Sequence, residues 1–293
     1  MFSNTFSDSL ILVVGRRDGD YRDSDYIHLS NTQIVDLTEQ ARSCPNLTEY
    51  PITPINSATG AIVSGHPMIC GGWSELPDFV AYSECYRYKK DSNTWIFLTN
   101  MTEKRMRSAS VVINGSLFVM GGFRGHSLGA QSSTEYISPD GYASQPGPEL
   151  PSARYGHCAV MLSTGQVMLL GGQDLESKSV ITFDHHTETF NTSLPPLKFD
   201  REHFGCAVFN SAMHENREVV LAAGGSNQAT AEVWDYTQPN AEWTESNYSF
   251  LLFNFILLAK KFLFVGPLKY TNWVHENICI NKSLLHSHRK DKK

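Results

Sequence analysis

The sequence predicts an all-β protein built from a repeated small sheet of about 50 residues. A Gly-Gly doublet follows a short apolar run four times, and the first glycines of these doublets are 50, 50 and 53 residues apart. Aromatic residues recur at matching places after each doublet. The 21 glycines and 13 prolines are spread along the 293 residues, which is typical of many short strands separated by turns.

Each copy contains the same parts in the same order. A run of small and β-branched residues, such as 109–113, is followed by a turn such as Asn114-Gly115 and by the strand that ends in the doublet. Asn-Gly predicts a two-residue hairpin because both residues tolerate a positive φ. A third strand carries an aromatic residue, and in three copies a second aromatic follows seven residues later.

A four-stranded sheet of this size is unstable alone, so both of its faces must be covered. Similar sheets stacked around an axis cover one another, as in a β-propeller. The doublet glycines leave room for a neighbouring backbone or ring, and the aromatics fill the gaps between sheets. A β-sandwich with accidental glycines is the alternative, and the regular spacing disfavours it. The positions expected to be structural are Gly71, Gly72, Gly121, Gly122, Gly171, Gly172, Gly224, Gly225, Tyr88, Trp95, Phe183, Phe190, Tyr236 and Trp243.

The period, the doublet and the aromatic pair resemble the Kelch repeat, whose copies form the blades of a β-propeller. The resemblance covers about residues 8–247 and implies blades at 57–100, 101–151, 152–197 and 198–247, after a partial one at 1–56. Kelch propellers commonly have six or seven blades. With about five recognisable four-stranded copies here, we expect a propeller that is incomplete or imperfectly closed.

Residues 248–293 are expected to form a tail outside the propeller. Residues 250–293 hold eight Lys or Arg against two acids, whereas the preceding residues hold 16 against 28. Lys260-Lys261 interrupt the apolar run after ten residues, which is short of the roughly 20 that a membrane helix needs. No transmembrane helix is expected. The alternatives are a weak interfacial anchor, a β-hairpin replacing part of a blade, or residues introduced by altered splicing.

The sequence offers several histidines and acids but no recognisable catalytic or metal site. His66, His157 and His203 precede strands and could line one end of a central channel, but a metal needs three or four converging ligands, so structural histidines are the default. His185-His186 are interpreted as a solvated turn.

Paired carboxylates for glycoside hydrolysis are not evident, because the candidate acids are loop residues. They are Asp174, Glu176, Asp184 and Glu188. No nucleophile elbow, phosphate-binding loop or zinc-protease motif occurs. We therefore expect no catalysis, metal or cofactor, with a Kelch-like copper oxidase as a remote alternative.

A non-catalytic protein-binding scaffold is the function that the sequence favours, with the contacts made by loops between blades on one face. The Kelch resemblance implies an arginine about sixteen residues before each doublet, and such an arginine either binds partner carboxylates or makes structural hydrogen bonds between blades. Loops just after the doublets are the other candidates. The proposed partner-binding residues are Arg105, Arg154, Arg201, Phe123, Arg124, His126, Gln173 and Asp174.

The compartment is left open by the sequence. The net charge of −6 gives no reason to expect nucleic acid as a partner. Six Asn-x-Ser/Thr sequons favour secretion, and a secreted propeller that binds glycan or protein is the alternative function; they begin at Asn46, Asn100, Asn114, Asn191, Asn247 and Asn281. The six cysteines form no C-x-x-C pair and are interpreted as buried thiols, or as disulfides if the protein is secreted; they are Cys44, Cys70, Cys85, Cys158, Cys206 and Cys279.

Overall fold

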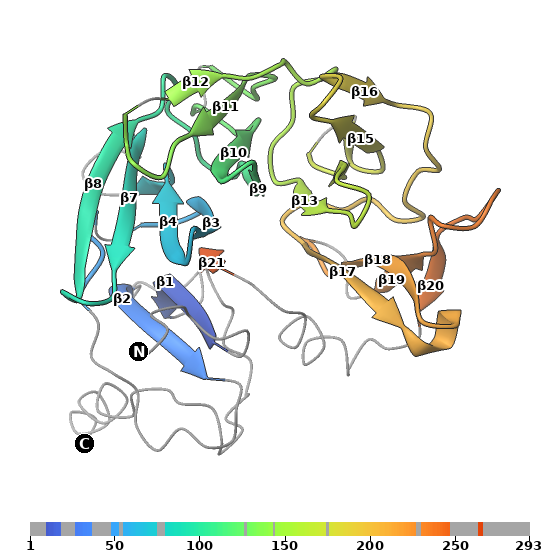
Figure 1. Ribbon diagram of the computed structural model, residues 1–293, viewed down its shortest axis with the longest axis horizontal. Coiled ribbons are helices and arrows are strands. Elements are labelled where there is room, and N and C mark those ends of the chain that lie inside the picture. The colour runs from blue at the N-terminus through green and yellow to red at the C-terminus, as the bar shows by residue number, and fades with distance from the viewer. Residues whose placement is uncertain are drawn as a thin grey trace.

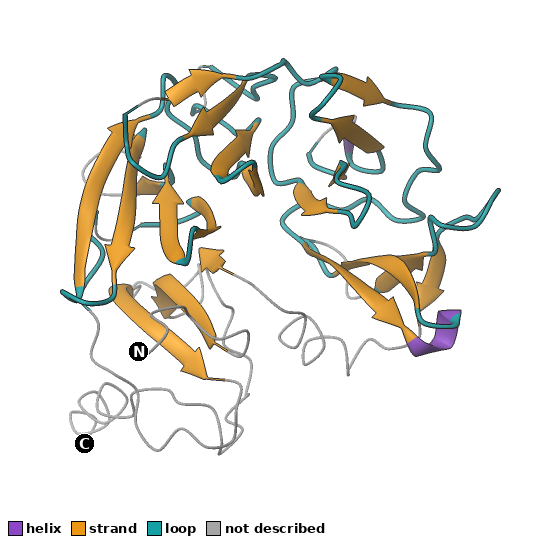
Figure 2. Ribbon diagram, in the orientation of Figure 1, coloured by secondary structure: helices purple, strands orange, loops and turns teal. Residues whose placement is uncertain are grey.

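The computed structural model describes residues 10–18, 27–36, 48–52, 55–74, 80–125, 128–142, 144–173, 176–226, 230–246 and 263–265. These residues form β-strands and one short 3-10 turn, η2 (Ala212–His214), as Figure 2 shows. The expected all-β class is confirmed. Most strands belong to four antiparallel sheets of four strands each.

Each four-stranded sheet is a continuous stretch of chain, with its strands in sequence order. The first sheet contains β3 (Thr59–Val63), β4 (His66–Cys70), β7 (Glu84–Lys89) and β8 (Thr94–Asn100). The second contains β9 (Ala109–Ile113), β10 (Ser116–Met120), β11 (Thr134–Ile137) and β12 (Ser144–Pro146). The third contains β13 (Cys158–Met161), β14 (Val167–Leu170), β15 (Val180–Asp184) and β16 (Thr189–Asn191). The fourth contains β17 (Gly205–Ser211), β18 (Arg217–Ala223), β19 (Ala231–Trp234) and β20 (Thr244–Ser246).

The four sheets lie around a common centre (Figure 1). In each sheet the first strand is nearest that centre and the fourth is at the periphery. The strands that the structure describes do not close a ring. This arrangement is consistent with a β-propeller. A short pair, β5 (Trp73–Ser74) with β6 (Val80–Ala81), branches off after the first doublet.

Neighbouring sheets bury each other's faces. In β10, Leu117 and Val119 pack with residues of the first sheet, whereas Phe118 and Met120 pack with residues of the third. Side chains alternate between the two faces of a strand, so one fully buried strand joins two neighbours. Trp243, just before β20, likewise belongs to a cluster that includes residues of the third sheet.

The aromatic residues connect neighbouring strands and sheets. Tyr88–Trp95 and Phe183–Phe190 are opposite each other across strands, with ring centroids 5.2 Å and 4.8 Å apart. Trp243 instead stacks near Trp234, at 5.6 Å. The ladder between β19 and β20 begins only after Trp243, so Tyr236 is not its cross-strand partner.

A fifth sheet joins the two ends of the chain. β1 (Leu10–Asp18) pairs antiparallel with β2 (Ile27–Asp36) and parallel with β21 (Leu263–Val265). The described part of the C-terminal stretch is the strand β21, and the other half of the hairpin considered from the sequence lies outside the described residues. The remainder of the expected tail at 248–293 lies outside the described residues. Within the described residues, no helix has the length and apolar character that crossing a membrane requires.

Four cysteines form disulfides, which replaces their interpretation as free thiols. Cys70 and Cys85 are opposite each other on β4 and β7 with Cα atoms 4.1 Å apart, so the strand register brings them together. Cys158 and Cys206 join β13 to β17, the innermost strands of consecutive sheets, with Cα atoms 6.0 Å apart. Cys44 and Cys279 lie outside the described residues.

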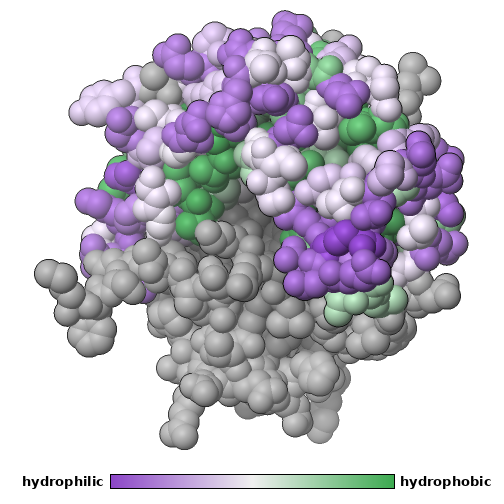
Figure 3. Space-filling model, turned by 45° about the vertical axis from the view of Figure 1, so that its right-hand side comes forward, coloured by the Kyte–Doolittle hydropathy of each residue, from purple (hydrophilic) through white to green (hydrophobic). Residues whose placement is uncertain are grey.

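Figure 3 shows one face of the molecule. On its described part, hydrophilic residues form most of the outer surface, and hydrophobic residues appear in patches between them. A polar exterior around sheets with apolar interiors is the pattern expected of stacked sheets that bury their faces on one another.

Candidate functional site

The Gly-Gly doublets are the points where one sheet meets the next. The Gly122 amide donates to the carbonyl oxygen of Arg154 in the following sheet at 2.9 Å. A Cβ on Gly121 would lie 2.5 Å from the same oxygen, so only glycine fits. The same amide contact, from the second glycine to an arginine carbonyl, occurs for Gly72 with Arg105 and for Gly172 with Arg201.

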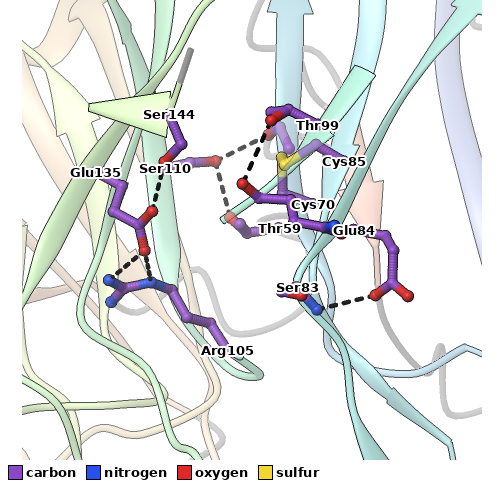
Figure 4. The surroundings of a disulfide bond; sticks show 12 residues. Thr59, Cys70, Ser83, Glu84, Cys85, Thr99, Arg105, Ser110, Glu135 and Ser144 are labelled. Atoms are coloured by element: carbon purple, nitrogen blue, oxygen red, sulfur yellow. Dashed lines mark hydrogen bonds and ion pairs between the residues drawn. A yellow bond between two sulfur atoms is a disulfide. The ribbon is translucent and has the colours of Figure 1, made fainter. Parts of the chain in front are cut away.

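The side chain of each of these arginines forms its hydrogen bonds within its own repeat unit. Arg105 donates from Nε and Nη2 to Glu135 Oε1 at 3.1 and 2.7 Å, as Figure 4 shows. Its Nη1 donates to the carbonyls of Gly121 and Ser133 at 2.9 and 2.7 Å. Burial raises the pKa of Glu135, but hydrogen bonds from Ser144, the Thr102 amide and Arg105 outweigh burial and hold this pKa below its ordinary value.

Arg201 repeats this arrangement, and Arg154 varies it. Arg201 donates from Nε to Glu232 Oε1 at 2.6 Å, and both side chains are 0% exposed. Arg154 pairs with Glu176, 3.0 Å away, which comes from the loop after the doublet and keeps 23% of its side chain exposed. Arg105 and Arg154 are 0% and 1% exposed. This burial favours the structural alternative for all three arginines over contact with a partner.

A second set of contacts links the sheets beside the doublets. The backbone amide of Arg107 donates to the carbonyl of Ser57 at 2.9 Å, Gly156 donates to Arg107 at 2.8 Å, and His203 donates to Gly156 at 2.7 Å. These residues occupy equivalent places just before β3, β9, β13 and β17, and we call them the rim. They are Ser57, Arg107, Gly156 and His203.

All four rim residues have left-handed backbone conformations. Their φ angles are 52°, 57°, 65° and 53° in chain order. Three of them carry side chains, and such a conformation costs roughly 1 kcal/mol or more per residue. The hydrogen bonds between sheets offset this cost. The fixed backbone conformation in turn sets the direction in which each rim side chain leaves the backbone.

Arg107 is the partly exposed cation of the rim. Its guanidinium carbon lies 5.9 Å from the centre of the Tyr155 ring, which is within the range of a cation–π contact. Tyr155 in turn lies 4.7 Å from the ring of Phe123. Among the described residues, Arg107 has no carboxylate within ion-pair distance. A cation beside an aromatic pair can bind a carboxylate.

His203 lies next to this cation. Its Nδ1 is 3.2 Å from Ser226 Oγ and 4.0 Å from Glu202. A Cβ on Gly156 would contact the His203 ring at 3.1 Å. Burial and the charge of Arg107 lower the pKa of His203, with Glu202 opposing them. His203 is therefore neutral near pH 7, which leaves the positive charge at this place to Arg107.

Three of the five proposed loop contact residues lie in the described part of the chain. Phe123 and Gln173 each follow a doublet, at the end of the sheets where the rim lies. Phe123 forms a β-bridge with Met106, and the backbone amide of Gln173 donates to the carbonyl of Tyr155. Arg124 is partly exposed, 3.5 Å from Glu103. His126 and Asp174 lie outside the described residues.

The three histidines that precede strands do not converge. His66 begins β4 at the end opposite the doublet, whereas His157 and His203 lie at the doublet end. His157 is buried, and neither ring nitrogen has a hydrogen-bond partner within the described part of the chain. Burial and the nearby Arg154 lower its pKa to about 3. Within that same part, no three His, Cys, Asp or Glu side chains are grouped so as to hold a metal.

No family model matches the chain, and neither does any curated protein. Among solved structures, that of YjhT is similar with a TM-score of 0.62 and 15% sequence identity. The match covers 82% of this chain and 83% of YjhT. At this identity the likeness supports the fold and carries no information about function.

Proposed function

We propose that the chain is a Kelch-type β-propeller that acts as a non-catalytic protein-binding scaffold, and that the rim docks an acidic segment of a protein partner. Arg107 carries this proposal. It is a partly exposed guanidinium with no carboxylate partner in the described part of the chain, held on a backbone whose left-handed conformation is fixed by the neighbouring sheets.

The environment of Arg107 suits a carboxylate. Guanidinium groups bind carboxylates through two parallel hydrogen bonds. Tyr155 lies beside the guanidinium, and the two aromatic rings of Tyr155 and Phe123 provide an apolar flank. The neutral state of His203 avoids a second cation that Arg107 would repel. The buried arginines at the doublets support the rim and leave recognition to this exposed one.

The test compares two charge reversals that differ in position. Arg107→Glu places an acid on the rim. Lys89→Glu makes the same charge change at the exposed end of β7, on the side of the first sheet away from its doublet. Proteins captured by the wild-type chain from an extract of its source tissue are identified, purified and titrated against both variants.

We expect Arg107→Glu to weaken binding of the captured partner at least tenfold and Lys89→Glu to change it less than twofold. Urea denaturation of both variants serves as the control for folding. Equal affinity of the Arg107→Glu variant and the wild type, with both folded, would refute the proposed site. Loss of binding in the Lys89→Glu variant alone would place the contact on the opposite end of the sheets.

A further inference from the structure

We infer that the chain matures in an oxidising secretory compartment and carries N-linked glycans on Asn100, Asn114 and Asn191. The inference rests on two independent observations. One is the covalent link between consecutive sheets, and the other is the placement of these sequons on the fold. Neither depends on the proposed function.

The Cys158–Cys206 disulfide joins innermost strands across a sheet boundary. The two residues are 48 positions apart, and closing a loop of that length restricts the unfolded chain and so stabilises the fold. Cys70 and Cys85 add a second disulfide within the first sheet. Disulfides that hold a fold together form in secretory compartments and are rare in the reducing cytosol. Forming each disulfide removes two electrons and two protons from a pair of thiols. A thiol-disulfide oxidoreductase accepts the two electrons by reduction of its own disulfide.

The three sequons that fall on described residues present exposed asparagines. Asn100 ends β8 and Asn191 ends β16, which are both outermost strands. Asn114 is in the hairpin turn between β9 and β10 with φ of 48°. The Asn191 Oδ1 accepts a hydrogen bond from the Ser193 amide at 3.0 Å, so its Nδ2 is the atom left to react.

The modification needs a lipid-linked oligosaccharyl pyrophosphate as the donor. The amide nitrogen Nδ2 forms a bond to the anomeric carbon of the first sugar, the bond from that carbon to the pyrophosphate breaks, and the nitrogen loses one proton. The sequon hydroxyls belong to Thr102, Ser116 and Ser193, of which Thr102 and Ser193 are exposed. A bulky hydrophilic glycan requires a surface position.

The three asparagines occupy two kinds of position on the sheets. Asn100 and Asn191 are on peripheral strands (Figure 1), with Asn100 opposite Glu84 at the doublet end of its sheet. Asn114 is in the turn before β10, at the end opposite the doublet. The rim lies at the doublet end, beside the innermost strands. Glycans on Asn100 and Asn191 would lie at the periphery of the sheets, and a glycan on Asn114 would lie at the end opposite the rim.

The experiment uses the natural protein purified from its source tissue. One portion is treated with a peptide-N-glycosidase in heavy-oxygen water, which converts each glycosylated Asn to a labelled Asp, and is then mapped by peptide mass spectrometry. A second portion is alkylated before reduction to locate free thiols. Ser193→Ala and Ser193→Thr variants, secreted from animal cells, form a matched pair, because only the Thr variant keeps its sequon.

We expect labelled Asp at two or more of the three positions, and Cys158 and Cys206 in one linked peptide pair. The Ser193→Ala variant should lose the mass of one glycan, and the Ser193→Thr variant should keep it. Label at one position or none would overturn the inference. So would alkylation of Cys158 or Cys206 before reduction, or equal masses for the two Ser193 variants.

Discussion

Replacing Arg201 by Ala removes half of a fully buried ion pair, and its cost can be estimated from the contacts. The guanidinium donates to Glu232, to the carbonyls of Gly224 and Thr230 at 2.7 and 2.9 Å, and to the Thr230 hydroxyl at 3.0 Å. The Glu232 side chain is 0% exposed and cannot regain water. Breaking a buried pair in this way costs about 3–5 kcal/mol of the free energy of unfolding.

The assay is urea denaturation followed by tryptophan fluorescence, since Trp234 is on the same strand as Glu232 and Trp243 packs beside Trp234. With a slope of about 3 kcal/mol per molar urea, the midpoint should fall by about 1–2 M. Arg154→Ala is the matched comparison, because Glu176 lies on a loop, is 23% exposed and can rehydrate. Its expected cost is smaller, about 1–3 kcal/mol.

The double replacement Arg201→Met with Glu232→Leu removes both charges and should recover most of the lost stability. A midpoint for Arg201→Ala within experimental error of the wild type would show that the pair does not stabilise the sheet. Equal losses for Arg201→Ala and Arg154→Ala would show that burial of the remaining acid is not what sets the cost.

Three further predictions concern the junctions between sheets. Gly121→Ala should cost about 1–3 kcal/mol more than Gly115→Ala in denaturation, because both have positive φ but only Gly121 faces a carbonyl, with open space at Gly115; equal costs would contradict the contact. His157 has its pKa lowered to about 3 in the fold, so the unfolded state binds its proton first and stability falls as pH drops below about 6.5, by about 2 kcal/mol at pH 5. In the His157→Phe variant, which has the residue type of Phe204 at the equivalent place before β17, the denaturation midpoint should depend less on pH. An unchanged pH dependence of the midpoint would mean that other groups cause it. Replacing Cys158 and Cys206 together by Ser should lower stability by about 4 kcal/mol. The variant should melt below the wild type when both are oxidised and at the same temperature when both are reduced, and a difference that persists after reduction would contradict the disulfide as the cause.

The regular parts of the fold could be predicted because they repeat. The doublet glycines indicated a close backbone approach, and the structure shows the approaching atom to be the Arg154 carbonyl at Gly121. The arginine position could be found from its spacing, but its role could not. Arg105 meets Glu135 thirty residues away, on a strand whose register the sequence leaves undefined.

The rim could not be predicted from local pattern. Its residues are about 50 positions apart, and only Gly156 carries the usual sequence signal for a left-handed backbone. Arg107, two residues after the conspicuous Arg105, gave no signal of its own. The contact of Trp243 with Trp234 could not be predicted from the seven-residue spacing, because the spacing does not show where β20 begins. The disulfides follow from strand register and from convergence of the inner strands, which spacing alone does not reveal.

The rim hydrogen bonds have a direction, because each unit donates an amide to the unit before it and offers a carbonyl to the unit after it. The rim hydrogen bonds at successive junctions are thus equivalent in donor and acceptor. A gene duplication or deletion that added or removed one whole unit between Ser57 and His203 would leave the same donors facing the same acceptors. Such a chain can change its number of repeats during evolution without having to invent a new interface.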